Sequence, residues 1–330
     1  MPERDDALQR WVADELKLSP VRLLPASADA SFRRYFRVET GRGSVIVMDA
    51  PPPQEDCRPF VRIAEMLRNA GVHAPEVLAK DLARGFLLLT DLGTRTYLDV
   101  LDEHNADALF GDAIDALCKW QSASRIDELP PYDRALLRRE LNLFPEWYVA
   151  RHLGIRLSAH EQNALETTFQ MLENSALAQP QVFVHRDYMP RNLMLSTPNP
   201  GVLDFQDAVY GPVTYDVVSL FRDAFVSWDE ARVAAWCAQY RERAKRSGLP
   251  VQDEPEFTRA LDWMGVQRHL KVLGIFARIK YRDGKPHYLA DTPRFVTYIR
   301  TVGSRYAEFA PLIKLFDRLE RHAGSEAVVS

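Results

Sequence analysis

The chain has 330 residues, a net charge of −4 and 46% hydrophobic residues, which is ordinary for a globular protein with room for two lobes. This charge argues against a nucleic-acid partner, and no apolar run approaches the length of a membrane span. Three widely spaced cysteines give neither a zinc site nor a disulfide framework, which indicates a reducing compartment. Because the N-terminus also lacks the apolar segment of a signal peptide, we expect a cytoplasmic protein.

The first part of the chain, residues 1–92, predicts a small and mostly β lobe. An opening amphipathic helix is indicated by apolar residues at helical spacing, Leu8, Trp11, Val12 and Leu16. Alternating apolar segments predict strands over residues 35–38, 45–48, 77–79 and 86–89. A helix that ends near Gly71 separates the two pairs of strands, and Gly93 supplies the backbone freedom of a hinge.

The remainder, residues 93–330, predicts a larger and mostly helical lobe. Helical patterns cover about 107–125, 134–153, 159–174, 215–226, 229–246, 255–280 and 293–308. Short apolar segments near residues 182–184, 193–195 and 202–203 interrupt this series and predict buried strands. We therefore expect an α+β protein with two lobes.

Three polar residues lie beside these short strands. His185-Arg186-Asp187 is followed by Asn192 and then by Asp204-Phe205. Asp187 can orient a hydroxyl and accept its proton, while Asn192 and Asp204 offer the oxygen ligands that Mg²⁺ prefers. This set is typical of phosphoryl transfer. The alternative is that the three are ordinary turn and strand-end residues, but the complete spacing is much rarer by chance than an isolated His-x-Asp.

These residues resemble the aminoglycoside phosphotransferase and choline kinase family. Within it the chain is most similar to the cell-wall-recycling kinases that phosphorylate the anomeric hydroxyl of N-acetylmuramate and N-acetylglucosamine. The resemblance extends to residues 31–38, 45–52, 88–93 and 215–220. It implies a bilobal protein-kinase-like fold, with residues 1–92 and 93–330 as the lobes, and ATP and Mg²⁺ as cofactors. It also implies an amino-sugar substrate and a role in peptidoglycan recycling.

The resemblance assigns roles to individual residues. It makes Asp187 the catalytic residue, and Asn192 and Asp204 the metal ligands. His185 is expected to support the catalytic loop rather than to act as an acid or base. Asp216, at a predicted helix start, is expected to hold the backbone of that loop. Asp207 is left open between a metal or substrate role and an ordinary loop charge.

The nucleotide site departs from the family pattern in two places. The expected phosphate loop, residues 25–34, contains no glycine, although Ser31 still offers a hydroxyl. The strand after it carries Met48 where the family normally has its phosphate-binding lysine, and Glu65 matches that lysine's usual partner. Without the lysine, the chain also fits a nucleotide-binding regulator that does not catalyse, although the intact catalytic set argues against this.

Another cation must then face the phosphates, and Arg33 and Arg34 are the nearest candidates. An arginine fork matches phosphate oxygens well, although both residues also fit charges at a solvated strand edge. The resemblance further places Leu89 and Asp91 beside the nucleotide.

The acceptor pocket is expected in the helical lobe. Arg191 can contact the acceptor or a phosphate, or can tie down the loop. Arg222 and Arg268 are candidates to pair with the lactyl carboxylate of N-acetylmuramate. The same catalytic set is compatible with other acceptors, such as an aminoglycoside, choline or homoserine.

Overall fold

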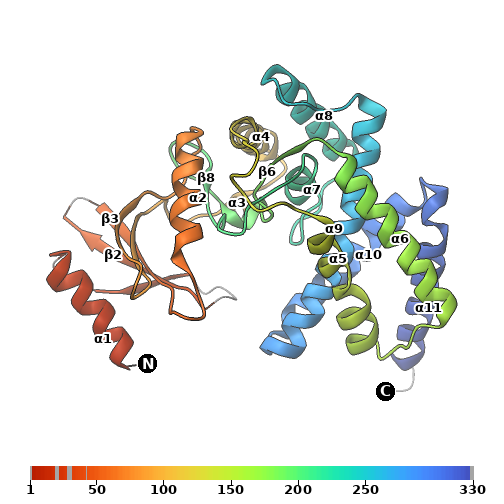
Figure 1. Ribbon diagram of the computed structural model, residues 1–330, viewed down its shortest axis with the longest axis horizontal. Coiled ribbons are helices and arrows are strands. Elements are labelled where there is room, and N and C mark those ends of the chain that lie inside the picture. The colour runs from red at the N-terminus through yellow and green to blue at the C-terminus, as the bar shows by residue number, and fades with distance from the viewer. Residues whose placement is uncertain (1, 19–21, 28–31, 42, 328–330) are drawn as a thin grey trace. The chain divides into compact units, whose positions relative to one another are not determined.

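The computed structural model describes residues 2–18, 22–27, 32–41 and 43–327 (Figure 1). The chain divides into two compact units. The first comprises residues 1–120 and 191–208, and the second comprises residues 121–190 and 209–330. The two units are defined by the contacts within each of them. The lobe boundary expected near residue 92 is a different division of the chain and stays a prediction.

The first unit is built on a five-stranded antiparallel sheet in the order β1-β2-β3-β5-β4. The strands are β1 (Leu24–Ser27), β2 (Arg34–Thr40), β3 (Gly43–Asp49), β4 (Val77–Asp81) and β5 (Phe86–Thr90). The four strands predicted from apolar alternation are present. Sequence reasoning missed β1, because this short edge strand contains Pro25, which weakens a strand prediction.

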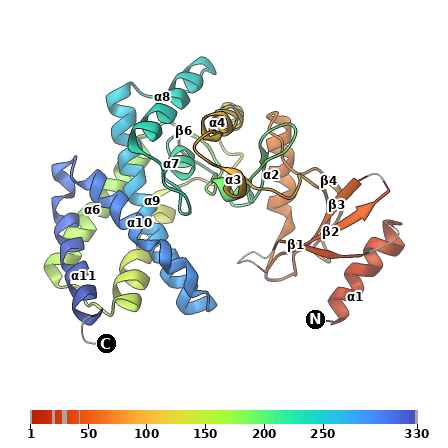
Figure 2. The same ribbon diagram turned by 180° about the vertical axis from the view of Figure 1, so that it is seen from behind.

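Helices cover both faces of this sheet, as both views show (Figures 1 and 2). On one face, α1 (Pro2–Arg10) and the helical turn η1 (Trp11–Glu15) bury Leu8 and Trp11 against Val47 and Phe86. On the other face lies α2 (Cys57–Asn69), which Asp56 caps by accepting from Arg58 N at 2.9 Å. The alternation of β3 therefore sends Val47 and Asp49 toward α1, and Ile46 and Met48 away from it.

The first unit also contains elements outside the sheet. It comprises α3 (Tyr97–Val100), most of α4 (Ala106–Ser122), and the hairpin of β7 (Leu193–Met194) and β8 (Gly201–Val202). Two β-bridges join the hairpin to other parts of this unit, His73 to Gly201 and Thr96 to Met194. The hairpin is therefore part of the unit that holds the sheet, although more than 70 residues separate it from α4.

The second unit is mostly helical and is centred on α9 (Glu254–Asp283). This helix begins at Asp253, whose side chain caps Glu256 N, and ends at Gly284, whose φ of 69° suits glycine. It packs against η2, α6, α7 and α10. The other elements are α5 (Arg134–Leu141), η2 (Phe144–His152), α6 (Ala159–Ala178), β6 (Gln181–Val184), η3 (Pro190–Asn192, at the unit boundary), β9 (Val209–Pro212), α7 (Tyr215–Phe221), α8 (Glu230–Arg246), η4 (Pro286–Asp291), α10 (Thr292–Gly303), η5 (Ala307–Phe309) and α11 (Ala310–Ala327).

Two predicted helices end differently in the structure. The helix expected over 215–226 stops at Phe221, because the Asp223 carboxylate accepts a hydrogen bond from Phe225 N at 3.0 Å and competes with the helical pattern. The helix expected over 134–153 is two elements, α5 and the π-helical η2, with Pro145 in the first turn of the second. The sequence analysis did not predict α3, α11 or β9.

Within the described ranges, no helix is long and apolar enough to cross a membrane.

Candidate active site

The backbone around Asp187 is held by a buried carboxylate. After β6, the amides of His185 and Arg186 donate to the two oxygens of Asp216 at 2.7 and 3.0 Å. Burial raises the pKa of Asp216 to about 7, while these two backbone bonds oppose the rise. Asp216 lies in the first turn of α7, where the helix dipole favours its negative charge. The residue expected to support the loop thus contacts the two amides that precede Asp187.

His185 is buried within the same loop. Its ring is 1% exposed and packs edge-on against Tyr188, with the ring centres 5.5 Å apart. Its Nδ1 accepts from the Asp187 amide at 3.3 Å, and Met189 N closes the turn on Asp187 O at 3.0 Å. These contacts fit a role in loop support.

A second buried carboxylate, Glu140 on α5, pairs with this loop. It accepts from the side chains of Arg186 and Tyr132, and it lies 2.9 Å from Lys271 Nζ on α9. Burial raises the pKa of Glu140, but Lys271 and Arg186 outweigh it and lower the pKa to about 2. Lys271 also donates to Tyr215 Oη at 2.8 Å. Sequence reasoning missed Glu140, because a single glutamate on a helix gives no signal of a partner 46 residues away.

The hairpin of the first unit brings the two expected metal ligands together. Leu203 N donates to Asn192 O at 2.9 Å, and Asn192 Nδ2 lies 3.5 Å from Asp204 Oδ2. Gln206 Nε2 donates to Asp204 Oδ1 at 2.9 Å. Asp204 has a φ of 61°, a conformation that is uncommon for residues other than glycine and that clusters at functional sites. One carboxylate and one amide are hard oxygen donors that fit Mg²⁺, provided that the amide of Asn192 turns its oxygen toward the ion.

A cavity of about 250 Å³ lies within this unit, and its wall includes Asn192 and Asp204. Leu89, Asp91 and Arg191, all expected at the nucleotide or acceptor, also line it. The remaining lining residues come from β1, β2, β3, α2, β5 and β7 and from the segments before β4, after β5 and after β8: Ala26, Tyr35, Arg37, Ile46, Phe60, Pro75, Thr90, Leu92, Gly93, Thr94, Thr96, Met194 and Leu203. The metal candidates therefore face a cavity bounded by the sheet.

Asp91 fixes one rim of this cavity. Its carboxylate accepts from the guanidinium of Arg37 on β2, from Ser44 Oγ at 2.7 Å and from Gly93 N at 2.9 Å. Arg37 Nη2 also donates to Gly93 O at 2.7 Å. Burial raises the pKa of Asp91, but the bonds from Arg37, Gly93 and Ser44 together outweigh it, and the net shift of the pKa is downward. Asp91 thus anchors the segment after β5 to β2 and β3.

Arg33 and Arg34 lie in different surroundings. Arg34 donates to Asp49 and lies 2.7 Å from Asp5, so it ties β2 and β3 to α1. Arg33 Nε lies 3.4 Å from Glu55, and its side chain is 11% exposed. Burial alone would lower the pKa of Arg33, yet Tyr35, Asp204 and Glu55 raise it, so the guanidinium lies within electrostatic range of the metal candidate. Ser31, the third residue expected here, lies outside the described residues.

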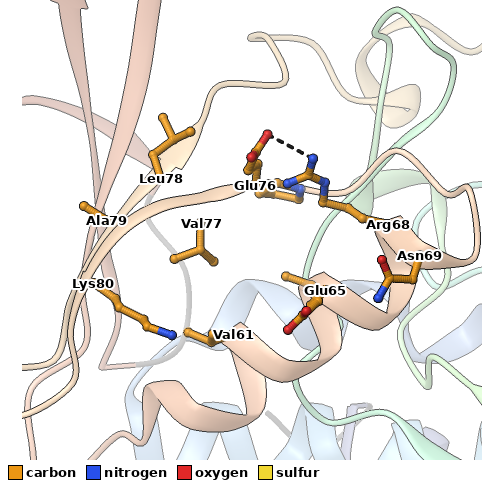
Figure 3. A pocket seen from close by; sticks show the side chains of 11 residues that line it. Val61, Glu65, Arg68, Asn69, Glu76, Val77, Leu78, Ala79 and Lys80 are labelled. Atoms are coloured by element: carbon orange, nitrogen blue, oxygen red, sulfur yellow. Dashed lines mark ion pairs between the residues drawn. The ribbon is translucent and has the colours of Figure 1, made fainter.

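Met48 is fully buried, and no ammonium stands in its place on β3. Glu65 is exposed and lines a separate groove of about 520 Å³ along α2 and β4. Figure 3 shows it there with Val61 and Lys80, while Arg68 pairs with Glu76 at 2.9 Å. This groove is larger than the cavity beside Asn192, but it holds none of the residues expected to carry the chemistry.

The two arginines expected at the acceptor are both buried. Arg222 Nη1 donates to Asp262 Oδ1 at 2.9 Å and lines a third cavity, on α8 and α9. Arg268 Nε donates to Ser219 Oγ at 2.7 Å, one turn after Tyr215. Asp216 lies within electrostatic range of both Asp187 and Arg268. Arg268 thus lies within electrostatic range of the carboxylate that binds the loop carrying Asp187, whereas Arg222 pairs with Asp262.

Comparison with known proteins identifies the family of this chain. Residues 22–249 match the model of the phosphotransferase enzyme family. The chain belongs to this family. The phosphotransferase is 56% identical to an N-acetylmuramate/N-acetylglucosamine kinase of Pseudomonas putida, over 99% of this chain and 100% of the relative. A protein of the same name from Pseudomonas aeruginosa is 59% identical, over 94% and 92% of the two chains, and one from Neisseria meningitidis is 46% identical, over 96% of both.

Solved structures show the same fold at low identity. A choline kinase, LicA of Streptococcus pneumoniae, matches the phosphotransferase with a TM-score of 0.65 at 12% identity, over 91% of this chain and 99% of that one. The ADP-bound aminoglycoside phosphotransferase APH(2'')-Ib matches with a TM-score of 0.57 at 14% identity, over 90% and 99%. The expected α+β fold of aminoglycoside phosphotransferases and choline kinases is confirmed.

Proposed function

We propose that this phosphotransferase transfers the γ-phosphoryl group of ATP to the anomeric hydroxyl of N-acetylmuramate or N-acetylglucosamine. The observation that carries the chemistry is the meeting of Asn192 and Asp204 in the wall of the cavity beside the sheet. The names of the curated relatives support the acceptor, since identity of 56% extends over 99% of this chain. Peptidoglycan recycling supplies such sugars inside the cell, and three buried free thiols fit a cytoplasmic enzyme.

In this reaction Asp187 acts on the acceptor. Its carboxylate orients the anomeric hydroxyl and takes the proton as the sugar oxygen bonds to the γ-phosphorus. The bond from that phosphorus to the bridging oxygen breaks, and ADP leaves with the electron pair. The bonds from His185 and Arg186 to Asp216 fix the loop, which lowers the entropic cost of aligning the hydroxyl.

Asn192 and Asp204 would hold Mg²⁺, which neutralises phosphate charge when it is bound. Arg33 would take the place of the missing lysine and face the phosphates, because it lies within electrostatic range of Asp204. Arg34 is already held by Asp49 and Asp5. Leu89, Asp91 and Arg191 would contact the nucleotide from the same cavity.

Phosphorus NMR of the product tests this assignment. We expect ATP and N-acetylglucosamine to yield a phosphate bonded to C1, and the 1-O-methyl sugar to be inert, because it has no anomeric hydroxyl. A 6-phosphate, or rapid phosphorylation of the 1-O-methyl sugar, contradicts the anomeric assignment. Turnover of choline but of neither sugar contradicts the substrate class.

A further inference from the structure

Asp223, which follows α7, is a buried carboxylate with one oxygen that makes no hydrogen bond to the residues that the structure describes. Asp223 is fully buried, and its Oδ2 accepts from Phe225 N at 3.0 Å. Its Oδ1 has no hydrogen-bond partner among the residues that the structure describes. Buried polar groups are nearly always paired, so an unpaired carboxylate oxygen indicates a missing partner.

An unpaired donor lies on the neighbouring helix. Arg268 on α9 is 2% exposed, and its Nε donates to Ser219 Oγ at 2.7 Å. Its Nη1 finds no acceptor in the described part of the chain. A guanidinium carries five N–H donors in a rigid arrangement. Burying it with one donor unpaired costs free energy, because that donor loses its hydrogen bonds to water.

The helix that carries Arg268 packs against the helix that precedes Asp223. Ser219, which binds Arg268, lies four residues before Asp223, and the carbonyl of Arg222 lies 3.3 Å from His269 Nε2, next to Arg268. Burial raises the pKa of Asp223, and Arg268 counters that rise, so the two charges are within electrostatic range. Asp216 lies within such range of both Arg268 and Asp187, which connects this pair to the catalytic loop.

We propose that Arg268 Nη1 and Asp223 Oδ1 bind the acetamido group of the acceptor sugar. This proposal rests on the proposed function. An acetamido group offers one carbonyl acceptor for the arginine and one N–H donor for the carboxylate. It is borne on C2, next to the anomeric carbon, and it is common to the two sugars in the relatives' names. One subsite could therefore serve both acceptors.

The charges favour an amide over the lactyl carboxylate. Asp223 would repel a second anion, whereas the neutral amide leaves the pair of opposite charges intact. The expectation that Arg268 pairs with the lactyl group is thereby replaced. The segment after Asp223, up to Asp229, is neither helix nor strand, and Ser227 Oγ lies 3.1 Å from Tyr298 Oη on α10. Because both residues are buried, the side chains around them must move for the sugar to reach the pair.

The test compares sugars with and without the acetamido group. In Arg268→Lys we expect kcat/KM for N-acetylglucosamine to fall about ten- to a hundredfold, the range of one bond to a charged group, while 2-deoxyglucose changes by less than about threefold. Asp223→Asn, which keeps an acceptor oxygen, should show a smaller selective loss. N-Acetylmuramate should fall in parallel with N-acetylglucosamine. Arg241→Gln, a half-buried arginine of α8 paired with Glu254, serves as the control for general damage to the helical unit.

Each outcome of this comparison either supports or overturns the acetamido subsite. Equal loss for 2-deoxyglucose, or no selective loss in either variant, overturns the subsite in favour of a structural role, such as a buried water. A selective loss of N-acetylmuramate overturns it in favour of a carboxylate site. Saturation-transfer NMR of the acetyl methyl group on wild type and both variants reads binding without turnover. If the wild type binds the N-acetyl sugars without turnover, the proposed function is contradicted and the subsite is not. If the wild type binds neither N-acetyl sugar, both the proposed function and the subsite are overturned.

Discussion

At the scale of single residues, Asp187 is placed by the backbone that precedes it. His185 and Arg186 donate to Asp216, and Arg186 has a φ of 76°, which turns the chain sharply before the carboxylate. The loop that carries Asp187 is thus held by backbone contacts that do not involve the carboxylate of Asp187. A substitution at position 187 itself should therefore leave these supports in place.

Asp187→Asn should keep the fold and ATP binding but lower kcat at least about tenfold, which is about 1.4 kcal/mol of barrier. The amide cannot accept the hydroxyl proton. Steady-state kinetics measure the loss, and thermal unfolding with and without ATP checks that folding and binding persist. Retention of more than a tenth of wild-type kcat would count against Asp187 as the base.

Arg33→Met should raise KM for ATP and lower kcat/KM by about 1.5–3 kcal/mol, or about ten- to a hundredfold, the value of one bond to a charged group. Adding Met48→Lys to this variant returns a cation to the sheet and should restore part of the loss. Arg34→Met is the matched control: it should lower stability through Asp49 without changing KM for ATP. If Arg33→Met binds ATP normally, another cation faces the phosphates.

The candidate site was predictable from the sequence only where its residues are near in the chain. Asn192 and Asp204 belong to one compact motif, so their meeting was predictable from the sequence. The different surroundings of Arg33 and Arg34 were not predictable. Adjacent residues of a strand face opposite sides of the sheet, and the sequence placed the start of β2 only to within a residue. The binding of Arg222 by Asp262 depends on a contact across 40 positions, for which the sequence carries no signal.

At the scale of elements, Glu140 joins three parts of the helical unit. It lies on α5, pairs with Arg186 of the catalytic loop and contacts Lys271 of α9. Its lowered pKa means that folding favours the charged form. Stability from this group is therefore present above its ordinary pKa of about 4.5 and is lost as the pH falls toward about 2.

Glu140→Gln should be less stable than the wild type at pH 7, by an amount of order 3 kcal/mol. The difference should narrow as the pH falls below about 4.5, because the carboxylate of Glu140 in the unfolded wild-type chain then takes up a proton before the folded one does. Urea unfolding between pH 7 and pH 3.5 measures this. A difference that stays constant with pH would show that the charge of Glu140 is not the stabilising feature.

Helices and strands were predicted correctly where apolar side chains recur at a regular spacing. The predictions failed where a side chain forms a hydrogen bond to the nearby backbone. The central strands and α9 have strong patterns and are present. The end of α7 was misplaced because the carboxylate of Asp223 bonds to the backbone two residues later, which hydrophobic periodicity does not encode. The break between α5 and η2 falls at Asn142 and Leu143. Neither residue type excludes a continuous helix, so the sequence did not indicate the break.

At the scale of the whole molecule, ligand binding should show in overall stability. ATP with Mg²⁺ at about 100 times its Kd should add about 2.7 kcal/mol to the free energy of unfolding, and excess chelator should remove most of this gain. Asp204→Asn should lose the part that depends on metal, whereas Asp187→Asn should keep all of it. Thermal unfolding with a titration of ATP and Mg²⁺ measures both. Equal stabilisation in chelator would contradict the metal site.

The first unit is assembled from two separate stretches of chain, residues 1–120 and 191–208. A ribosome makes the first stretch early and must then synthesise 70 residues of the other unit before the hairpin with Asn192 and Asp204 follows. The sheet can form beforehand, but its cavity lacks one wall until residue 208 has left the exit tunnel. During that interval the apolar lining of the nascent sheet stays uncovered, so this is the stage of synthesis at which a chaperone should be needed most.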